Sequence, residues 1–280
     1  MSQGTDAANV ESWSGKSRGD ENFPVGSALI SARLRPHVHA YYAFARNADD
    51  IADSPDLAPA DKIRRLDVME AVLLGTRASA SPSALGLRAS LAGCGVTPRH
   101  ATDLLIAFRQ DATKTRYANW AELLDYCRFS AMPVGRHVLA LHGESEDSFP
   151  ASDALCAALQ VLNHLQDIQK DLLQLDRCYL PQDLLARFDA SIDDIPRPAA
   201  TPGMRRVIDT LLDECDALNR AGRRLPPLVR DRRLRLEVAV ILGLAERLAA
   251  RLRRQDPIAR RVKLSKADAM GALFAALRHW

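Results

Sequence analysis

Apolar residues recur every three or four positions along most of this 280-residue chain, which is the spacing of helices that bury one face. The helix breakers fall between these segments, and the β-branched residues do not alternate with polar ones as they would in half-buried strands. Apolar residues make up 47% of the chain, which is enough to fill a large core. The sequence therefore predicts an all-α globular protein.

Start and stop signals predict where the helices lie. Asn119 precedes one helix that runs to Gly143, and Ser152 caps the helix that carries residues 160–171. Residues 175–200 contain three prolines and are expected to form a loop with one short turn. Further helices are expected from Pro36 to Asp53, from Pro59 to Gly75, after Thr97-Pro98, after Thr201-Pro202, over 231–255 and over 265–280.

Acidic side chains occur four residues apart on two of these expected helices. Asp49 and Asp53 share one helix face, about 6 Å apart along the axis. Asn163, Asp167 and Asp171 form a second stripe. Like charges on one face destabilise an isolated helix, whereas Mg²⁺ prefers hard oxygen ligands of this kind. Two such helices facing each other in a bundle would form a metal site for a phosphorylated ligand, although either acidic stripe alone is typical of a solvated surface.

The net charge of +3 is distributed unevenly along the chain. Residues 201–280 carry 18 Lys and Arg against 9 Asp and Glu, while residues 1–200 are net acidic. A basic surface favours nucleic acid or an anionic membrane as a partner, but no nucleic-acid-binding motif accompanies these charges. We therefore expect reversible membrane association through the basic C-terminal region and no nucleic-acid partner. The alternative is a solvated face of arginine-rich helices.

The remaining composition predicts a reduced, cytoplasmic protein that can lie on the inner face of the membrane. Residues 1–22 are polar without an apolar segment, and no run approaches the roughly 18–20 apolar residues of a membrane span. The five cysteines are scattered and form no CxxC pair. We expect a flexible polar N-terminus over residues 1–22 and a single catalytic domain over residues 23–280.

Four motifs follow one another along the chain. They are Tyr42-x3-Arg46-x2-Asp49-x3-Asp53, Tyr126-Cys127 leading to Val134-Gly135, Gln160-x2-Asn163-x3-Asp167-x3-Asp171, and Arg177-x-Tyr179-x-Pro181. Together they resemble the squalene/phytoene synthase family of head-to-head trans-isoprenyl diphosphate synthases. The resemblance implies the isoprenoid synthase helical bundle, in which two aspartate-rich helices face each other across a central apolar cavity.

The resemblance also implies roles for individual residues. Two or three Mg²⁺ ions bridging a diphosphate would be held by Asp49, Asp53, Asn163, Asp167 and Asp171. Catalytic roles would fall to Tyr42, Arg46 and Tyr126, and substrate contacts to Asn22, Phe23, Gln160, Arg177 and Tyr179. The chemistry agrees, because a leaving diphosphate needs divalent metal and Arg, and the carbocation left behind needs a dry cavity with aromatic faces. Phe44 and Phe129 are further candidates for those faces.

Several polar residues near these motifs are expected to play structural parts. The histidines His37, His39, His137, His142 and His164 show no metal-ligand spacing with an acid, so we interpret them as structural or surface residues. Asp111 and Lys114 predict a surface ion pair, with a third polar patch at the cavity mouth as the alternative.

Three departures from the family pattern bear on the reaction. Asp20-Glu21-Asn22-Phe23-Pro24 stands where the family usually has Ser-x-Ser/Thr-Phe, Gln166 and Lys170 replace an Arg and an acid, and Ser265 replaces an Arg of NADPH-using members. These features resemble the bacterial hopanoid branch, which converts presqualene diphosphate and water to hydroxysqualene and diphosphate without NADPH.

Two other functions remain open from the sequence. One is head-to-head condensation of two prenyl diphosphates, such as farnesyl diphosphate, to squalene, dehydrosqualene or phytoene. The other is a non-catalytic assembly or binding protein of the same fold. Other enzymes of the squalene pathway are expected partners in either enzymatic case.

Overall fold

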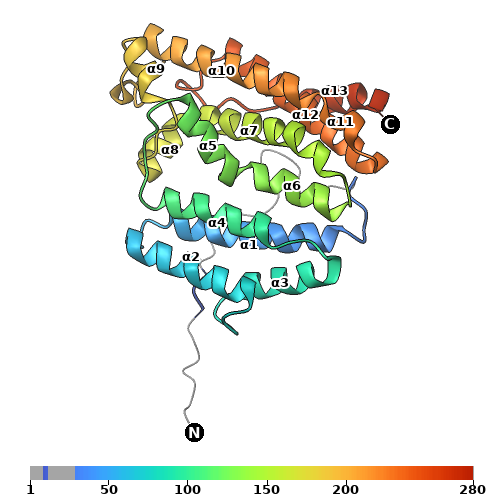
Figure 1. Cartoon of the computed structure of the whole chain (residues 1–280). Coiled ribbons are helices and arrows are strands. Elements are labelled where there is room, and N and C mark those ends of the chain that lie inside the picture. The colour runs from blue at the N-terminus through green and yellow to red at the C-terminus, as the bar shows by residue number, and fades with distance from the viewer. Residues whose placement is uncertain (1–8, 12–28, 280) are drawn as a thin grey trace. The chain divides into compact units, whose positions relative to one another are not determined.

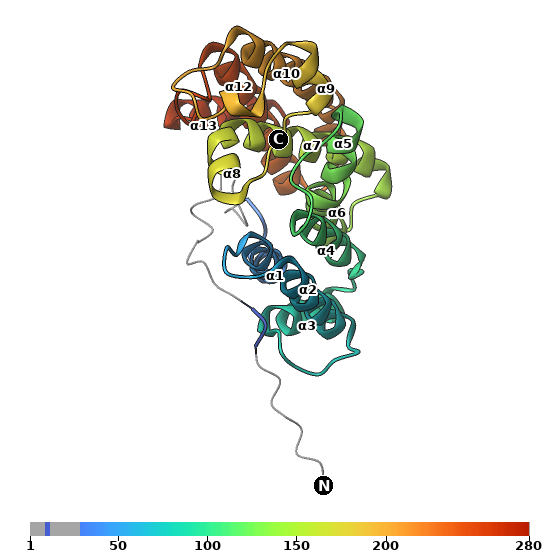
Figure 2. The same cartoon turned by 90° about the vertical axis from the view of Figure 1, so that its left-hand side faces the viewer.

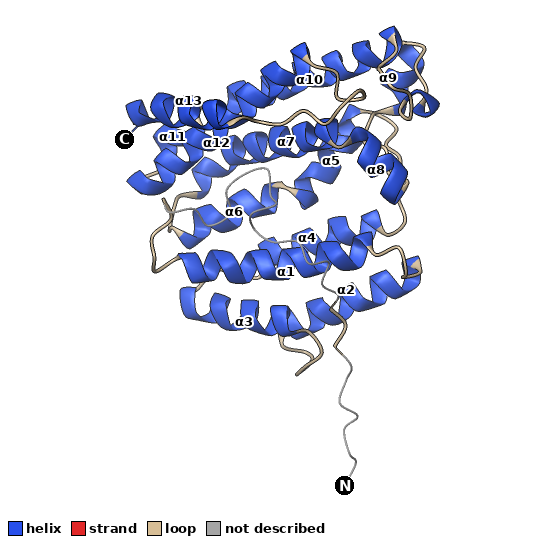
Figure 3. Ribbon diagram, turned by 180° about the vertical axis from the view of Figure 1, so that it is seen from behind, coloured by secondary structure: helices blue, strands red, loops and turns tan. Residues whose placement is uncertain are grey.

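The computed structural model describes residues 9–11 and 29–279, which form helices joined by loops (Figure 3). Within these residues the only β-type pairing is a single bridge between Arg116 and Cys178. The prediction of an all-α protein is therefore confirmed. The chain divides into two compact units, Met1–Thr113 and Lys114–Trp280. One catalytic domain over residues 23–280 stays a prediction, and Asn22 and Phe23 lie outside the described residues.

The first unit is a four-helix bundle. Its helices are α1 (Arg35–Asp53), α2 (Pro59–Leu74), α3 (Pro82–Cys94) and α4 (Arg99–Asp111). Helix α1 packs against the other three, as the view along the bundle in Figure 2 shows. A proline lies in the first turn of α1, α2 and α3, and Gly75 ends α2 with φ of 81°, a left-handed conformation that favours glycine. Fully buried apolar side chains hold the bundle together, among them Phe44, Ile51, Leu66, Met69, Leu87 and Leu105.

Residues 9–11 are bound to the first unit. The Glu11 carboxylate accepts hydrogen bonds from the Ser83 backbone N–H at 2.7 Å and the Ser81 hydroxyl at 2.5 Å, at the beginning of α3. A carboxylate in this position is stabilised by the unpaired N–H groups and the dipole of the helix N-terminus. These three residues are the described part of the N-terminus that the sequence predicts to be flexible.

The second unit is built around three long helices. They are α7 (Phe149–Gln166), α10 (Pro202–Gly222) and α12 (Arg232–Arg254). Helix α10 packs along α7 and α12, and α12 packs along the C-terminal helix α13 (Lys266–Ala276), as Figure 1 shows. The shorter elements of this unit are α5 (Trp120–Ser130), α6 (Met132–Leu141), α8 (Ile168–Leu175), α9 (Gln182–Arg187), α11 (Leu225–Leu228) and the 3₁₀ turns Glu146–Ser148, Ile192–Asp194 and Leu277–His279.

Helix α5 ends at Ser130, although the sequence predicted one continuous helix from Asn119 to Gly143. Ala131, with φ of −131° and ψ of −45°, separates α5 from α6. Pro133 then lies in the first turn of α6, where its missing N–H and fixed φ are tolerated. The proline inside the apolar pattern therefore divides this segment into two helices.

The segment around α7 also differs from the prediction at both ends. The helix begins at Phe149 after Ser148, so Ser152 lies buried inside it and does not cap it. At the other end, Asp167 with φ of −108° interrupts the expected helix over residues 160–171, and α8 starts at Ile168. The loop over 175–200 contains the short helix α9 and a 3₁₀ turn, which is more structure than the single turn expected.

None of the helices within residues 29–279 combines the length and the apolar character that crossing a bilayer requires.

Gly135 is the close-packing point between α6 and α7. A Cβ atom there would lie 2.6 Å from the Cys156 sulfur and even closer to the Ser152 hydroxyl, both on α7. Because short side chains on a packed helix cannot retreat, Gly135→Ala is expected to lower the free energy of unfolding by about 1–3 kcal/mol. Gly86→Ala, on an open face of α3 with no atom within 4 Å of the new Cβ, is the control. It should stabilise by up to about 1 kcal/mol. Urea denaturation measures both, and a stable Gly135→Ala protein would contradict the packing argument.

Candidate active site

Four side chains predicted for the site lie on one face of α1. Tyr42, Asp49 and Asp53 are half-buried, and Arg46 is buried among them. The two carboxylates occupy the last turns of the helix, which contain no basic residue nearer the C-terminus than Arg46. The C-terminal end of a helix carries partial negative charge, so carboxylates there are unfavourable without a cation. This end of α1 is therefore a site of concentrated negative potential.

Arg46 is held between two aspartates of its own helix. Its Nη1 lies 2.9 Å from Oδ2 of Asp49, and its Nε donates to Oδ1 of Asp50 at 3.0 Å. The Arg46 and Asp50 side chains are only 9% and 3% exposed, whereas Asp49 is 33% exposed. Asp50 thus fixes Arg46 from the buried side, and Asp49 contacts Arg46 from the more exposed side. Asp50 was not among the predicted site residues, although its position four residues after Arg46 on the helix indicates the ion pair.

The ionisation of Asp49 is strongly opposed by its surroundings. Burial, followed by the nearby charge of Asp53, raises the pKa of the Asp49 carboxyl to about 8 against the opposing effect of Arg46. Asp111 at the end of α4 adds to this rise. Asp111 is buried, so the prediction that it forms a surface ion pair with Lys114 is wrong. Lys114 instead pairs with Glu122.

At the break between α7 and α8, the Asp167 carboxylate is bound by an arginine from a distant part of the chain. Arg261 binds this carboxylate through both oxygens, with Nε 2.5 Å from Oδ1 and Nη2 2.9 Å from Oδ2. The neighbouring Gln166 donates from its side-chain amide to the Val262 carbonyl at 2.6 Å. Two adjacent residues of the break are thereby tied to two adjacent residues that lie about ninety positions later in the chain. Gln166 is buried in this contact, which gives it a structural part.

Aromatic rings gather beside the second acidic stripe. His164 stacks on Tyr179 with ring centroids 3.5 Å apart, and Tyr126 and Tyr117 lie within 5.6 Å of the Tyr179 ring. His164 also places Nδ1 3.4 Å from an oxygen of Asp171 and Nε2 3.1 Å from the Gln160 amide. All four rings are buried. We call Tyr117, Tyr126, His164 and Tyr179 the aromatic cluster.

Two loop segments bring the aromatic cluster together. Cys178 donates its backbone N–H to Thr115 at 2.9 Å, and Gln182 donates to Tyr117 at 2.9 Å. The Arg177 backbone N–H in turn binds the Asp171 carbonyl at 3.0 Å. This pairing sets Tyr179 against Tyr117 and keeps the buried Arg177 next to the end of the acidic stripe. Tyr126, Arg177 and Tyr179 were predicted for the site from the sequence motifs, whereas Tyr117 and His164 were not.

The donors on both acidic stripes are suited to a hard divalent cation. They are carboxylate and side-chain amide oxygens, and Asn163 and Asp171 are half-buried beside the aromatic cluster. Within residues 9–11 and 29–279, no three His, Cys, Asp or Glu side chains converge as a ready-made metal cluster.

Three other predicted residues have structural surroundings. Phe44 is fully buried in the core of the first unit, and Phe129 lies under the Arg128 guanidinium at 5.3 Å. Ser265 caps α13 by accepting the Asp268 N–H at 3.2 Å, and Arg251 donates to its hydroxyl at 3.0 Å. Ser265 is thus a helix cap in this protein.

Known proteins resemble this chain in sequence and in fold. The sequence profile described as squalene/phytoene synthase matches residues 16–268. A hydroxysqualene synthase of Sinorhizobium fredii is 48% identical over 246 residues, which cover 88% of this chain and 84% of the relative. A hydroxysqualene synthase of Rhodopseudomonas palustris is 46% identical, covering 94% and 90%. The crystal structure of squalene synthase HpnC from Alicyclobacillus acidocaldarius has a TM-score of 0.74 at 37% identity, covering 85% of this chain and 90% of that one.

Proposed function

The chain belongs to the squalene/phytoene synthase family and is an isoprenoid synthase, and from this premise we propose that it converts presqualene diphosphate and water to hydroxysqualene and diphosphate. The observation that carries the proposal is the similarity to three relatives named hydroxysqualene synthase. They are 43–48% identical over 88–94% of this chain. Relatives named phytoene synthase reach 28–32% identity.

The proposed metal is Mg²⁺, held by the oxygen ligands of both acidic stripes. Asp49 and Asp53 would contribute from α1, and Asn163, Asp167 and Asp171 from the α7–α8 segment. When bound, Mg²⁺ would stabilise the charge that develops on the diphosphate as its bond to carbon breaks. Support comes from the hard oxygen donors and from the raised pKa of Asp49, since a nearby cation would relieve the repulsion with Asp53.

The remaining site residues bind and position the substrate. Arg46 keeps its contact with Asp50 and offers guanidinium N–H groups to the leaving diphosphate, and Arg177 is proposed to bind the diphosphate in the same way. The face of Tyr126 stabilises the carbocation that remains, because an aromatic face attracts positive charge, and Tyr179, which stacks on His164, contacts the substrate. His164 positions these groups through its contacts with Gln160, Asp171 and Tyr179. The proposed substrate contacts also include Tyr42, Asn22 and Phe23.

Capture of the carbocation by water balances the reaction. The carbon–oxygen bond to diphosphate breaks, the cyclopropane rearranges, and a water oxygen forms a new bond to carbon while releasing one proton. No reductant is consumed, so NADPH is not required for this product. The site must therefore admit one water molecule while the rest of the cavity stays apolar.

Product analysis tests the proposal directly. Purified protein with Mg²⁺ and presqualene diphosphate should yield hydroxysqualene and diphosphate in equal amounts, with or without NADPH. In ¹⁸O-labelled water the product hydroxyl should carry the label. Farnesyl diphosphate is the comparison substrate. Efficient conversion of farnesyl diphosphate alone to squalene, dehydrosqualene or phytoene would replace this proposal with the condensation reaction.

Location and partners follow from the substrate. Presqualene diphosphate has a long hydrocarbon part, so we propose a cytoplasmic enzyme that binds the inner membrane face reversibly and exchanges substrate and product with other squalene-pathway enzymes. Fractionation of cells in low and high salt would test the location, with recovery in the membrane fraction only at low salt as the expected result.

A further inference from the structure

The second half of helix α13 and the 3₁₀ turn that follows it expose an apolar stripe. Met270, Leu273, Phe274 and Leu277 follow the three- and four-residue spacing of one helix face, and Phe274 is 65% exposed. We call these four residues the α13 stripe. A set of large apolar side chains exposed together costs solvation free energy and is typical of a surface that binds an apolar partner.

The opposite face of α13 packs against α12, so the α13 stripe is turned away from the core of the second unit. Ala272 and Ala276 are buried, and a Cβ at Gly243 of α12 would lie 3.3 Å from that of Ala272. Ser265 and Asp268 form a capping box at the start of the helix. Arg251 of α12 binds Asp268 at 2.7 Å, which ties this end of α13 to the second unit.

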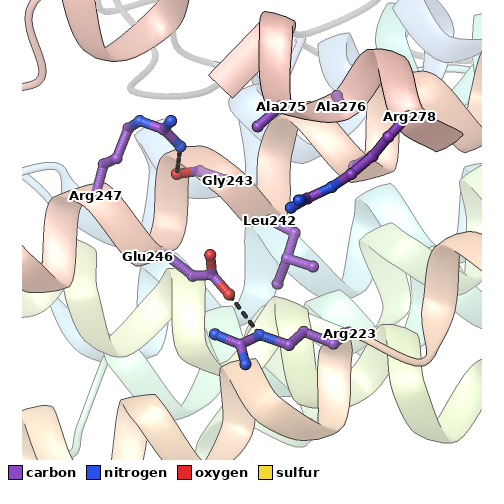
Figure 4. A pocket seen from close by; sticks show the side chains of 9 residues that line it. Arg223, Leu242, Gly243, Glu246, Arg247, Ala275, Ala276 and Arg278 are labelled. Atoms are coloured by element: carbon purple, nitrogen blue, oxygen red, sulfur yellow. Dashed lines mark hydrogen bonds and ion pairs between the residues drawn. The ribbon is translucent and has the colours of Figure 1, made fainter. Parts of the chain in front are cut away.

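Positive charge borders the α13 stripe. Lys266 is exposed one turn before Met270, and Arg278 follows Leu277. Arg247 of α12 lies against Gly271, where a Cβ would be 3.1 Å from its Nη2. Arg247 and Arg278 line a pocket of about 520 Å³ beside α13 (Figure 4). Arg247 donates to the Gly243 carbonyl at 2.9 Å, a neutral group that leaves its charge available to an anion.

Acidic side chains on α13 do not offset this charge. Asp268 is the single acidic residue of the helix, and it is bound to Arg251 and to the Ser265 cap. Many other arginines of the basic C-terminal region are neutralised by carboxylates. These pairs include Arg205–Asp209, Arg223–Glu246, Arg253–Asp213 and Arg253–Asp216. Lys266, Arg247 and Arg278 therefore place positive charge next to the α13 stripe.

We propose that α13 is the membrane-binding element of this enzyme and that it binds the surface of an anionic phospholipid bilayer. The α13 stripe enters the boundary between headgroups and acyl chains, while Lys266, Arg247 and Arg278 bind lipid phosphates. A bilayer fits better than a second copy of the chain, because two copies would bring together regions with 18 basic and 9 acidic residues each. The inference specifies the surface for the proposed membrane association and does not depend on which product the enzyme makes.

Vesicle co-sedimentation of the full-length protein tests the proposal. The probes are vesicles of phosphatidylcholine alone and vesicles that also contain phosphatidylglycerol. The wild-type protein should bind the anionic vesicles, with less binding at high salt. Phe274→Glu should lower the vesicle partition coefficient at least about tenfold, since it puts a charge into the acyl boundary. Leu74→Glu is the matched control at the end of α2, where Leu74 is 50% exposed, and it should bind like the wild type.

A second variant separates the headgroup contacts from the apolar ones. Arg247→Gln combined with Arg278→Gln should weaken binding to anionic vesicles and reduce its dependence on salt. Thermal melting of every variant shows whether it is folded. Equal vesicle binding by Phe274→Glu and the wild type overturns the proposal, as does a wild-type protein that binds neither kind of vesicle at low salt.

Light scattering distinguishes the other occupant of this face. If Phe274→Glu converts a dimer to a monomer and leaves vesicle binding unchanged, the α13 stripe is a protein interface and the proposal is wrong. Turnover is measured separately on substrate in detergent. A protein that binds vesicles but makes no hydroxysqualene contradicts the proposed reaction alone, and one that makes hydroxysqualene without binding vesicles contradicts this inference alone.

Discussion

Asp49→Asn is expected to lower turnover of presqualene diphosphate by at least about a hundredfold, the size seen when one electrostatic stabiliser of a reaction is removed. Asn is a weaker metal ligand than a carboxylate, so the bound diphosphate would lose positive charge at the moment it leaves. The folded protein should remain stable, because the substitution removes repulsion with Asp53 and keeps an oxygen for Arg46.

Asp167→Asn should reduce turnover to a similar extent but should also cost stability. Its carboxylate is only 8% exposed and is paired with Arg261, so loss of the ion pair should lower the free energy of unfolding by about 1–3 kcal/mol. Steady-state kinetics with saturating Mg²⁺ and chemical denaturation measure the two effects.

Asp61→Asn provides the control for both substitutions. Asp61 is an exposed aspartate of α2 that pairs with Arg64, so its replacement tests the loss of an aspartate charge outside the proposed site. Turnover and stability of this variant should match the wild type. Wild-type turnover in both Asp49→Asn and Asp167→Asn would remove the metal assignment.

The second large expected effect is a pH dependence of Mg²⁺ binding. The Mg²⁺ affinity of the protein should rise about tenfold per pH unit below about pH 8, because Mg²⁺ binds the ionised form of Asp49, whose pKa is raised to about 8. Above that pH the affinity should level off. Between pH 6 and pH 8 the expected change is therefore about a hundredfold. Asp49→Asn should weaken Mg²⁺ binding and flatten this profile.

The stability of the metal-free protein should change with pH in the opposite direction. The folded protein binds the Asp49 proton more tightly than the unfolded chain, where an Asp pKa is about 3.9. Ionisation of this group therefore lowers the free energy of unfolding as pH rises from about 4 to about 8. Asp49→Asn removes that contribution, so the variant should gain stability relative to the wild type as the pH rises.

Isothermal titration with Mg²⁺ and a non-hydrolysable diphosphate measures the affinity profile, and denaturation in a chelator measures the stability profile. The comparison of wild type and Asp49→Asn at each pH isolates the contribution of this one carboxyl. Identical pH profiles for the two proteins in both experiments would show that Asp49 titrates as an ordinary surface aspartate.

Local patterns in the sequence predicted most of the long helices and the face of α1 that carries its acidic residues, but they missed α3 and the helix breaks at Ala131 and Asp167. The face shared by Tyr42, Arg46, Asp49 and Asp53 depends only on backbone hydrogen bonds between neighbouring turns, and α1 carries them as predicted. The ends of α2 at Pro59 and Gly75 are local for the same reason, since fixed proline φ and positive glycine φ act within one turn. The four spaced motifs likewise predicted the family that the comparisons confirm.

Contacts between distant parts of the chain determined the rest of the site. Arg261 and Asp167 are 94 residues apart, and no repeating pattern connects them. Tyr117 joins Tyr179 only because two loop segments pair through backbone hydrogen bonds. The helix break at Asp167 coincides with the ties to Arg261 and Val262, so side-chain contacts accompany a departure from the local helical pattern. Spacing along one helix is a property of the backbone, whereas the partner of a buried charge depends on which distant segment packs beside it.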